Sequence, residues 1–169
     1  MIKSPPLPIR CQAGFTLVEL ITVMLVIGIM AVVVLPRFDL LKGFDEIGYR
    51  DKVRATLEYA RKAAVAQRRY SCVSLSGNNL ILTIDQNVPE SYVAGTCPAN
   101  ALRLPAADGN CSPAAADRIC APSSVFIAAG PATLVFSPLG RPAATGYAYT
   151  VHGDADHVVT VEAESGYVH

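Results

Sequence analysis

The strongest pattern along the chain is an apolar segment near the amino terminus. Residues 15–35 are apolar or small except at three positions, Thr16, Glu19 and Thr22. At about 1.5 Å of rise per residue, a helix of this length extends roughly 30 Å, which matches the hydrocarbon core of a bilayer. The pattern therefore predicts a transmembrane helix over residues 15–36. Because Lys3 and Arg10 precede it, the following residues are expected on the outer side of the membrane.

A second helix, with one apolar side, is predicted over residues 37–70. Four apolar residues recur at steps of three or four positions, which places them on one helix face: Val53, Leu57, Ala60 and Ala64. Charged side chains lie between them, as on a solvated surface. Gly43 and Gly48 weaken the first part, so a break is predicted near residues 42–48.

Short runs typical of β-strands follow and predict an antiparallel sheet. They lie at 72–75, 80–84, 124–128, 133–136, 147–151 and 157–163, with a last short strand expected at 167–169. Gly77 and Asn78 predict the first hairpin turn. Residues 85–123 are rich in Pro, Ala, Gly and Cys and too long for an ordinary connection, so disulfides are expected to hold them in place of a core. The fold class is α+β: a long helix leading into a β-rich head over residues 71–169.

The composition is that of a single globular domain, and the net charge gives no sign of a strongly charged partner. The chain has 169 residues, and 51% of them are hydrophobic, which is enough for a core and argues against disorder. Fourteen basic residues balance fourteen acidic ones. Net charge therefore points to neither nucleic acid nor an anionic membrane surface as a partner.

Five cysteines are present, at positions 11, 72, 97, 111 and 120. Their spacing fits neither a zinc site nor a CxxC redox motif, so the last four are predicted to form two disulfides in an exported domain. Four cysteines allow three pairings. The short loop from Cys111 to Cys120 favours that pair, with Cys72 joined to Cys97, but the sequence leaves the other pairings open.

The small residue expected at a processing site lies before the apolar segment, not after it. An ordinary secretory signal is cut behind its apolar region at an A-x-A-like site, and residues 31–37 offer none. Cleavage after Gly14 would leave the apolar segment on the mature chain, with Phe15 as the new amino terminus. Glu19 would then lie about one helical turn from a free amine.

The stretch GFTLVEL at 14–20, followed by apolar residues, resembles the class III signal of type IV prepilins and type II secretion pseudopilins. The resemblance implies a leader of residues 1–14, cleavage between Gly14 and Phe15 by a prepilin peptidase, and methylation of the new amine of Phe15. Pro36 falls where many family members have a proline that kinks the helix. The alternative is a plain anchor with a chance glutamate, although a carboxylate at membrane depth is costly without a partner.

Three motifs in the head indicate a smaller group within this family. YARKAAVAQRR at 59–69, FSPLGRP at 136–142 and VTVEAESGYV at 159–168 resemble the H-type pseudopilin and FimT-like minor pilin group. The chain also resembles the MshC-type minor pilins of mannose-sensitive haemagglutinin pili. The resemblance implies the pilin architecture, a hydrophobic helix followed by a small antiparallel sheet, whereas the insert at 85–123 matches no pattern of the family.

Other candidate chemistry in the sequence is weak. HGDADH at 152–157 is the best metal candidate, but it lies between two predicted strands, so a hairpin turn is favoured and neither metal nor cofactor is expected. The candidate DNA contacts form a dense basic group, namely Arg61, Lys62, Arg68 and Arg69. A solvated helix face is the favoured interpretation of this group, because Glu58 can neutralise it and no aromatic platform is evident. Enzymatic activity has no positive support, since motifs such as GxSxG are missing.

The sequence therefore predicts a structural assembly subunit, a minor pilin or pseudopilin. It is expected in the bacterial inner membrane with a periplasmic head and then in a filament, with other pilins or pseudopilins and the inner-membrane assembly platform as partners. Glu19 is expected to meet the amine of Phe15, in its own chain or a neighbouring one, because close opposite charges offset each other's desolvation. The alternative is a tip-displayed module that binds DNA or a surface receptor.

Overall fold

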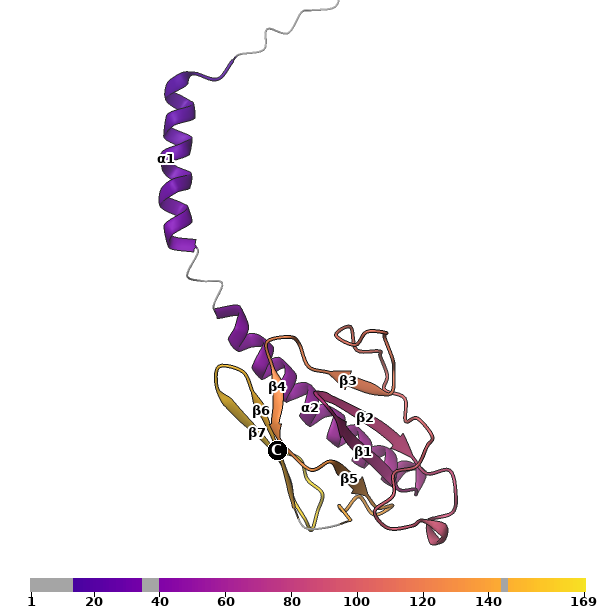
Figure 1. Cartoon of the computed structure of the whole chain (residues 1–169). Coiled ribbons are helices and arrows are strands. Elements are labelled where there is room, and N and C mark those ends of the chain that lie inside the picture. The colour runs from indigo at the N-terminus through magenta and orange to yellow at the C-terminus, as the bar shows by residue number, and fades with distance from the viewer. Residues whose placement is uncertain (1–13, 35–39, 144–145) are drawn as a thin grey trace, which may run out of the picture. The chain divides into compact units, whose positions relative to one another are not determined.

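The computed structural model describes residues 14–34, 40–143 and 146–169 (Figure 1). The chain divides between residues 38 and 39 into two units, which are described separately. The first contains helix α1 (Leu17–Val34), and the second contains helix α2 (Leu40–Gln67) followed by the strands. The α+β class predicted from the sequence is confirmed.

Helix α1 has 18 residues and carries apolar side chains on all sides. Among the described residues, no helix is both long and apolar enough to cross a membrane, so the span predicted over residues 15–36 is not confirmed. The kink predicted at Pro36 lies outside the described residues.

Helix α2 runs without interruption through Gly43 and Gly48, so the break predicted near residues 42–48 is wrong. A glycine inside a helix costs about 1 kcal/mol relative to alanine, and tertiary packing outweighs this cost here. Tyr49, directly after Gly48, is buried in the core, and its hydroxyl donates a hydrogen bond to the Asn78 carbonyl oxygen at 2.9 Å. Packing within the head therefore stabilises a helical segment for which the local sequence has a low helix propensity.

Two antiparallel sheets form the rest of the head. The first has the order β3-β2-β1-β5 and is made of β1 (Ser71–Ser76), β2 (Asn79–Ile84), β3 (Arg118–Cys120) and β5 (Thr133–Phe136). The second has the order β4-β6-β7 and is made of β4 (Phe126–Ala129), β6 (Tyr147–His152) and β7 (Asp156–Val161). All six predicted strands are present, and β3 is an additional strand inside the stretch predicted as a long connection.

The predicted first turn is found, and the strand predicted at 167–169 is reduced to an isolated bridge. Gly77 lies in the β1–β2 turn with φ of 59°, a conformation that glycine adopts without strain. Thr160 and His169 exchange two backbone hydrogen bonds, of 2.8 and 3.0 Å, and Val168 forms a bridge with Val161. The carboxyl terminus therefore covers the outer edge of β7.

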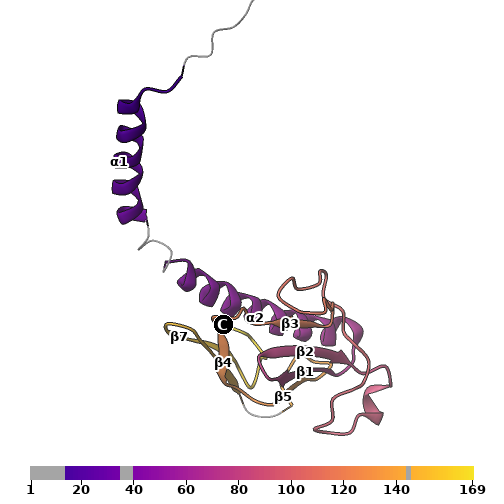
Figure 2. The same ribbon diagram turned by 45° about the horizontal axis from the view of Figure 1, so that its top comes forward.

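The core lies between α2 and the two sheets, as Figure 2 shows from a second direction. Helix α2 contacts strands of both sheets. The four residues predicted for its apolar face have no exposed surface, namely Val53, Leu57, Ala60 and Ala64. They pack in one cluster with Val73, Leu82, Leu134, Val151 and Val159.

The connection from β2 to β3 is held by more than disulfides. Backbone hydrogen bonds of 2.8 and 3.0 Å, from Ile84 to Asn100 and from Leu102 to Leu82, lay part of it along the edge of β2. Leu102 and Ile119 are buried in the main core. The expectation that disulfides stand in for a core is therefore only partly right, because this insert also contributes apolar side chains to the core of the head.

Leu57→Ala should destabilise the head by about 2–5 kcal/mol, because it removes a fully buried side chain from a packed core. Val65→Ala is the matched control, since Val65 lies two turns further along α2 and is 46% exposed. Urea unfolding of residues 39–169 measures both. Equal, small losses for the two variants would contradict the packing described here.

Candidate assembly site

The start of α1 gives Glu19 a local role. Residues 14–16 are not helical, and the Thr16 Oγ1 accepts a hydrogen bond from the Glu19 backbone N–H at 3.2 Å. The T-x-x-E spacing is that of a capping box, and a carboxylate in the first turn is favoured by the helix dipole. Thr22, by contrast, donates its hydroxyl to the Glu19 carbonyl oxygen at 2.9 Å. Of these three polar residues, only Glu19 carries a charge, and the two hydrogen bonds involve its backbone and not its carboxylate.

The predicted cleavage site is accessible in this structure. Gly14 has open space around it, and the Phe15 side chain is 85% exposed. The bond between them therefore lies in exposed, non-helical chain directly before α1. This is the arrangement that a peptidase needs in order to bind the chain in an extended form.

The apolar side chains of α1 are also exposed within the described residues. Leu17, Met24, Ile29 and Met30 are among a set of large apolar residues that each expose about half of their surface or more. A helix that is apolar on all sides buries its surface against lipid or against other helices. The surface of α1 can therefore serve assembly.

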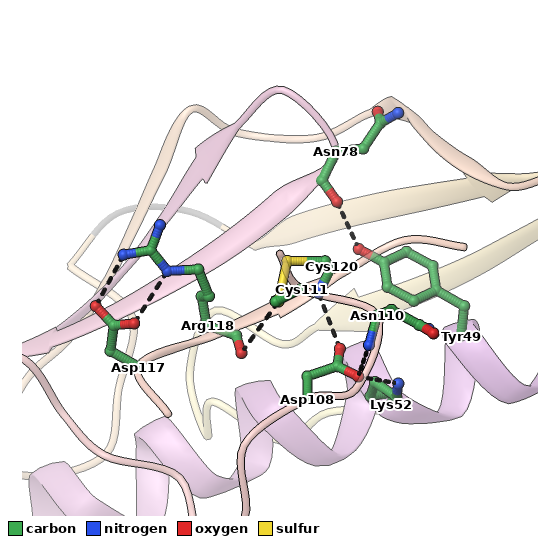
Figure 3. The surroundings of a disulfide bond; sticks show 9 residues. All are labelled: Tyr49, Lys52, Asn78, Asp108, Asn110, Cys111, Asp117, Arg118 and Cys120. Atoms are coloured by element: carbon green, nitrogen blue, oxygen red, sulfur yellow. Dashed lines mark hydrogen bonds and ion pairs between the residues drawn. A yellow bond between two sulfur atoms is a disulfide. The ribbon is translucent and has the colours of Figure 1, made fainter. Parts of the chain in front are cut away.

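Both disulfides favoured by the sequence are present in the structure. Cys111 is joined to Cys120, and Cys72 is joined to Cys97. The first bridge lies at the end of the β2–β3 connection, close to α2 (Figure 3). Cys72 belongs to β1, so the second bridge ties the same connection to the middle of the first sheet.

The basic group does not form a free patch. Arg61 donates to the Gly140 carbonyl oxygen at 3.2 Å, and Lys62 donates to the Glu58 carboxylate at 3.1 Å. Arg69 donates to the carbonyl oxygens of Gln86 and Asn87. Arg68 is exposed at the end of α2, in a left-handed conformation with φ of 52°. Three of the four predicted DNA contacts therefore have a hydrogen-bond partner within the chain, and of these Lys62 stays 70% exposed.

The motifs FSPLGRP and VTVEAESGYV meet at Arg61. Gly140, which accepts the Arg61 hydrogen bond, has φ of 79°, and Gly166 has φ of 64°. A Cβ on Gly166 would lie 2.0 Å from the Gly140 carbonyl oxygen. Both glycines are therefore required for two turns to pack together beside α2, a structural reason for these motifs.

HGDADH is a hairpin turn, as its position between strands predicted. It connects β6 to β7, and the tip closes around Glu46 of α2. The Glu46 carboxylate, 4% exposed, accepts hydrogen bonds from the backbone amides of Asp154 and Ala155, the latter at 3.2 Å, and lies 3.3 Å from His157 Nε2. Within the described residues, no group of three or more potential ligands is placed to hold a metal ion.

Sequence reasoning missed the role of Glu46. The Asp154 amide has the largest influence and lowers the pKa of Glu46 below its ordinary value of 4.5, while burial opposes it and the Ala155 amide and His157 add to it. A Cβ on Gly153 would lie 2.3 Å from the Glu46 Cγ, so only glycine allows this approach. The glycine within HGDADH was the available signal, but its partner is more than a hundred residues away.

Comparison with known proteins supports the amino-terminal motif and the fold. A family model described as the prokaryotic N-terminal methylation motif matches residues 9–35, which include Gly14, Phe15 and Glu19. Among curated proteins, none is detectably similar to this chain in sequence.

Two crystal structures of the type IV minor pilin FimU from Pseudomonas aeruginosa PAO1 are similar to this chain. The form in space group P21 has a TM-score of 0.53 and 15% identity over 77% of this chain and 90% of that one. The form in space group P65 has a TM-score of 0.48 and 16% identity over 71% and 87%. The first likeness shows that the chain has the pilin fold. Neither this likeness nor the methylation motif distinguishes the H-type or MshC-type groups.

The hydrogen bonds from the β6–β7 hairpin to Glu46, called here the clamp on Glu46, should make the stability of the head sensitive to acid. Because the pKa of Glu46 is lowered in the folded head, the ionised carboxylate stabilises the fold above its ordinary pKa, and this contribution is lost as the pH falls through the folded value. Glu46→Gln lacks this titration. Between about pH 5 and about pH 3, urea midpoints of the wild type should therefore fall more steeply than those of Glu46→Gln.

Glu58→Gln is the control for this measurement. Glu58 forms surface ion pairs with Arg54 and Lys62, and surface pairs contribute little to stability. Its acid dependence should follow the wild type. Equal slopes for the wild type and Glu46→Gln would show that the clamp is not responsible for acid sensitivity.

Proposed function

We propose that this chain is a minor pilin, a non-enzymatic structural subunit that assembles into or primes a type IV pilus-like filament. The observation that carries the proposal is the combination of a methylation motif on an exposed apolar helix with a head of the pilin fold. An apolar surface of this kind needs a cover, and neighbouring helices of the same type supply one in a filament. Other pilins or pseudopilins are the proposed partners.

Processing of the amino terminus is the first step of this proposal. A prepilin peptidase cuts between Gly14 and Phe15, removes the leader of residues 1–14, and the new amine of Phe15 is methylated. The exposed Phe15 and the open surroundings of Gly14 support access by the enzyme. The leader contains Cys11, so processing leaves four cysteines, all of which are paired.

Glu19 acts in assembly by pairing with the amine of Phe15 from its own chain or from a neighbour. Phe15 lies four positions before Glu19, a separation of about 6 Å along the axis once both belong to one helix. The Thr16 cap supports the proposal because it orders the first turn and holds Glu19 at its third position. Between apolar helices, such a pair offsets the desolvation of both charges only when the two subunits are in register.

The finer assignments rest on sequence. The three head motifs support membership of the H-type pseudopilin and FimT-like group. A member of that group could serve in a type II secretion filament in place of a pilus. The methylation motif supports residence at the bacterial inner membrane, with the head in the periplasm, before assembly at the platform. The basic group offers little support for DNA binding, because most of its members are bound within the chain.

Mass spectrometry of the mature protein from its host tests the processing step. We expect a chain that begins at Phe15 and carries one added methyl group. Gly14→Val should keep the full length, because the proposed cleavage site depends on a small residue before Phe15. A wild-type chain that retains residues 1–14 would contradict the proposal.

Glu19→Val should lower incorporation into filaments at least about tenfold, because breaking a buried charge pair costs about 3–5 kcal/mol. Thr22→Val is the matched control, since Thr22 is also a polar residue of α1 but bonds only to its own helix. Immunoblots of sheared filaments measure both variants. Normal incorporation of Glu19→Val would exclude the carboxylate from assembly.

A further inference from the structure

The first turns of α2 are attached to the head differently from the rest of the helix. From Tyr49 onward, α2 buries an apolar face that includes Val53 and Leu57. Among residues 44–48, by contrast, the one buried residue is Glu46, which is 3% exposed. A polar side chain therefore makes the main attachment of this part of α2 to the head.

The other contacts of these turns are weak. Phe44 borders a small hollow beside Pro122 but stays 70% exposed, and Ile47 is 49% exposed. Ser124 donates its hydroxyl to the Asp45 carboxylate at 3.4 Å, which is long for such a hydrogen bond, and both groups are exposed. Little buried apolar surface therefore holds this part of α2 in place.

The helix itself gives these turns little support. Gly48 lies within them and Gly43 directly precedes them, and glycine is the poorest helix former after proline. The first four N–H groups of a helix have no partner within it, so the first hydrogen bonds of α2 are those of residues 44–48. A segment with few buried apolar contacts opens locally at a lower free energy than the core of the same domain.

The β6–β7 hairpin lies beside the first half of α2 and binds Glu46 (Figure 1). The Glu46 carboxylate accepts hydrogen bonds from the amides of Asp154 and Ala155, the latter at 3.2 Å, and lies 3.3 Å from His157 Nε2. Gly153 makes this approach possible, because a Cβ there would overlap with the Glu46 side chain. Three groups of the hairpin therefore converge on the one buried side chain in this part of α2.

The clamp depends on the ionised form of Glu46. Of the charged side chains described around it, His157 contacts the carboxylate. The others in the hairpin and on α2 are exposed or pair among themselves, namely His152 with Asp156, Arg50 with Asp51, Asp45 and Asp154. The Asp154 amide lowers the pKa of Glu46 most, so the carboxylate is charged and the clamp is closed at neutral pH. Protonation weakens the carboxylate as an acceptor and removes its attraction for His157.

We propose that the clamp on Glu46 is a conformational latch. When it opens, the start of α2 up to Gly48 leaves the head and unfolds locally, while the core from Tyr49 onward stays folded. Residues 40–48 rise about 14 Å as a helix and span about 30 Å when extended. Opening therefore lengthens the chain that leads from α1 to the core of the head by up to about 16 Å. The latch is a property of the head and does not depend on the proposed filament function.

Hydrogen exchange of the full chain in detergent micelles, read by mass spectrometry, tests the latch. In Glu46→Gln, and in Gly153→Ala, which forces the Glu46 side chain aside, the amides of residues 44–48 should exchange at least about tenfold faster at neutral pH. Amides of β1, β2 and β6 should keep their wild-type rates. Asp45→Asn is the matched control, because it removes a charge from the same turn but contacts Ser124 and not the hairpin. Its exchange should follow the wild type.

Two results would overturn the latch. Unchanged exchange of residues 44–48 in both variants would show that the clamp does not hold the start of α2. Faster exchange of equal size in the strands would show that the clamp supports the whole head and that the first turns are not a separate unit.

Acid gives a second measurement that needs no variant. Between about pH 5 and about pH 3, the ionised form of Glu46 is lost as the pH falls through its lowered pKa. In the wild type, protection factors of residues 44–48 should therefore fall at least about threefold more than those of β1 and β2. An equal fall in all three segments would contradict a local latch.

Discussion

Burial of one face of α2 against two sheets is the interaction on which the head depends. Val53 and Leu57 fill the space between the sheets, while Ala60 and Ala64 let the helix backbone approach closely. Fully burying a side chain such as leucine or valine contributes about 1.5–3 kcal/mol. This gain carries α2 through Gly43 and Gly48, where local propensity alone predicts a break. The positions of Glu46 and Lys52, and hence the hairpin contact to Glu46 and the Lys52–Asp108 ion pair, follow from that continuous helix.

The two helices have different roles because their apolar residues are distributed differently. In α2 the apolar residues lie on one face, and the same chain covers them. In α1 they lie all round the helix, and the described residues leave them exposed. A surface that its own fold leaves open must be covered by lipid or by another chain, which is why the proposed function is assembly. Glu19, capped by Thr16 at the start of α1, is the charged group within that surface.

The β2–β3 connection shows how a segment without a clear pattern can become rigid. Two disulfides, hydrogen bonds along the edge of β2 and the buried Asp108 hold it beside α2. None of these interactions requires a periodic arrangement of apolar residues, so pattern analysis describes the segment only as long and irregular. Lys52 of α2 ties this segment to the helix through its ion pair with Asp108.

The sequence by itself determined the features that depend on local order: the methylation motif around Gly14 and Glu19, the apolar face of α2, the strands and their tight turns. These follow from periodicity and from residues close together in the chain. Only the tertiary structure decided that the hairpin at HGDADH hydrogen-bonds to Glu46, that Arg61 lies where two glycine turns meet, and that Asp108 pairs with Lys52 of α2. The physical reason is that each of these contacts joins groups far apart in sequence, where the energy comes from burial and hydrogen bonds that exist only once the head has folded.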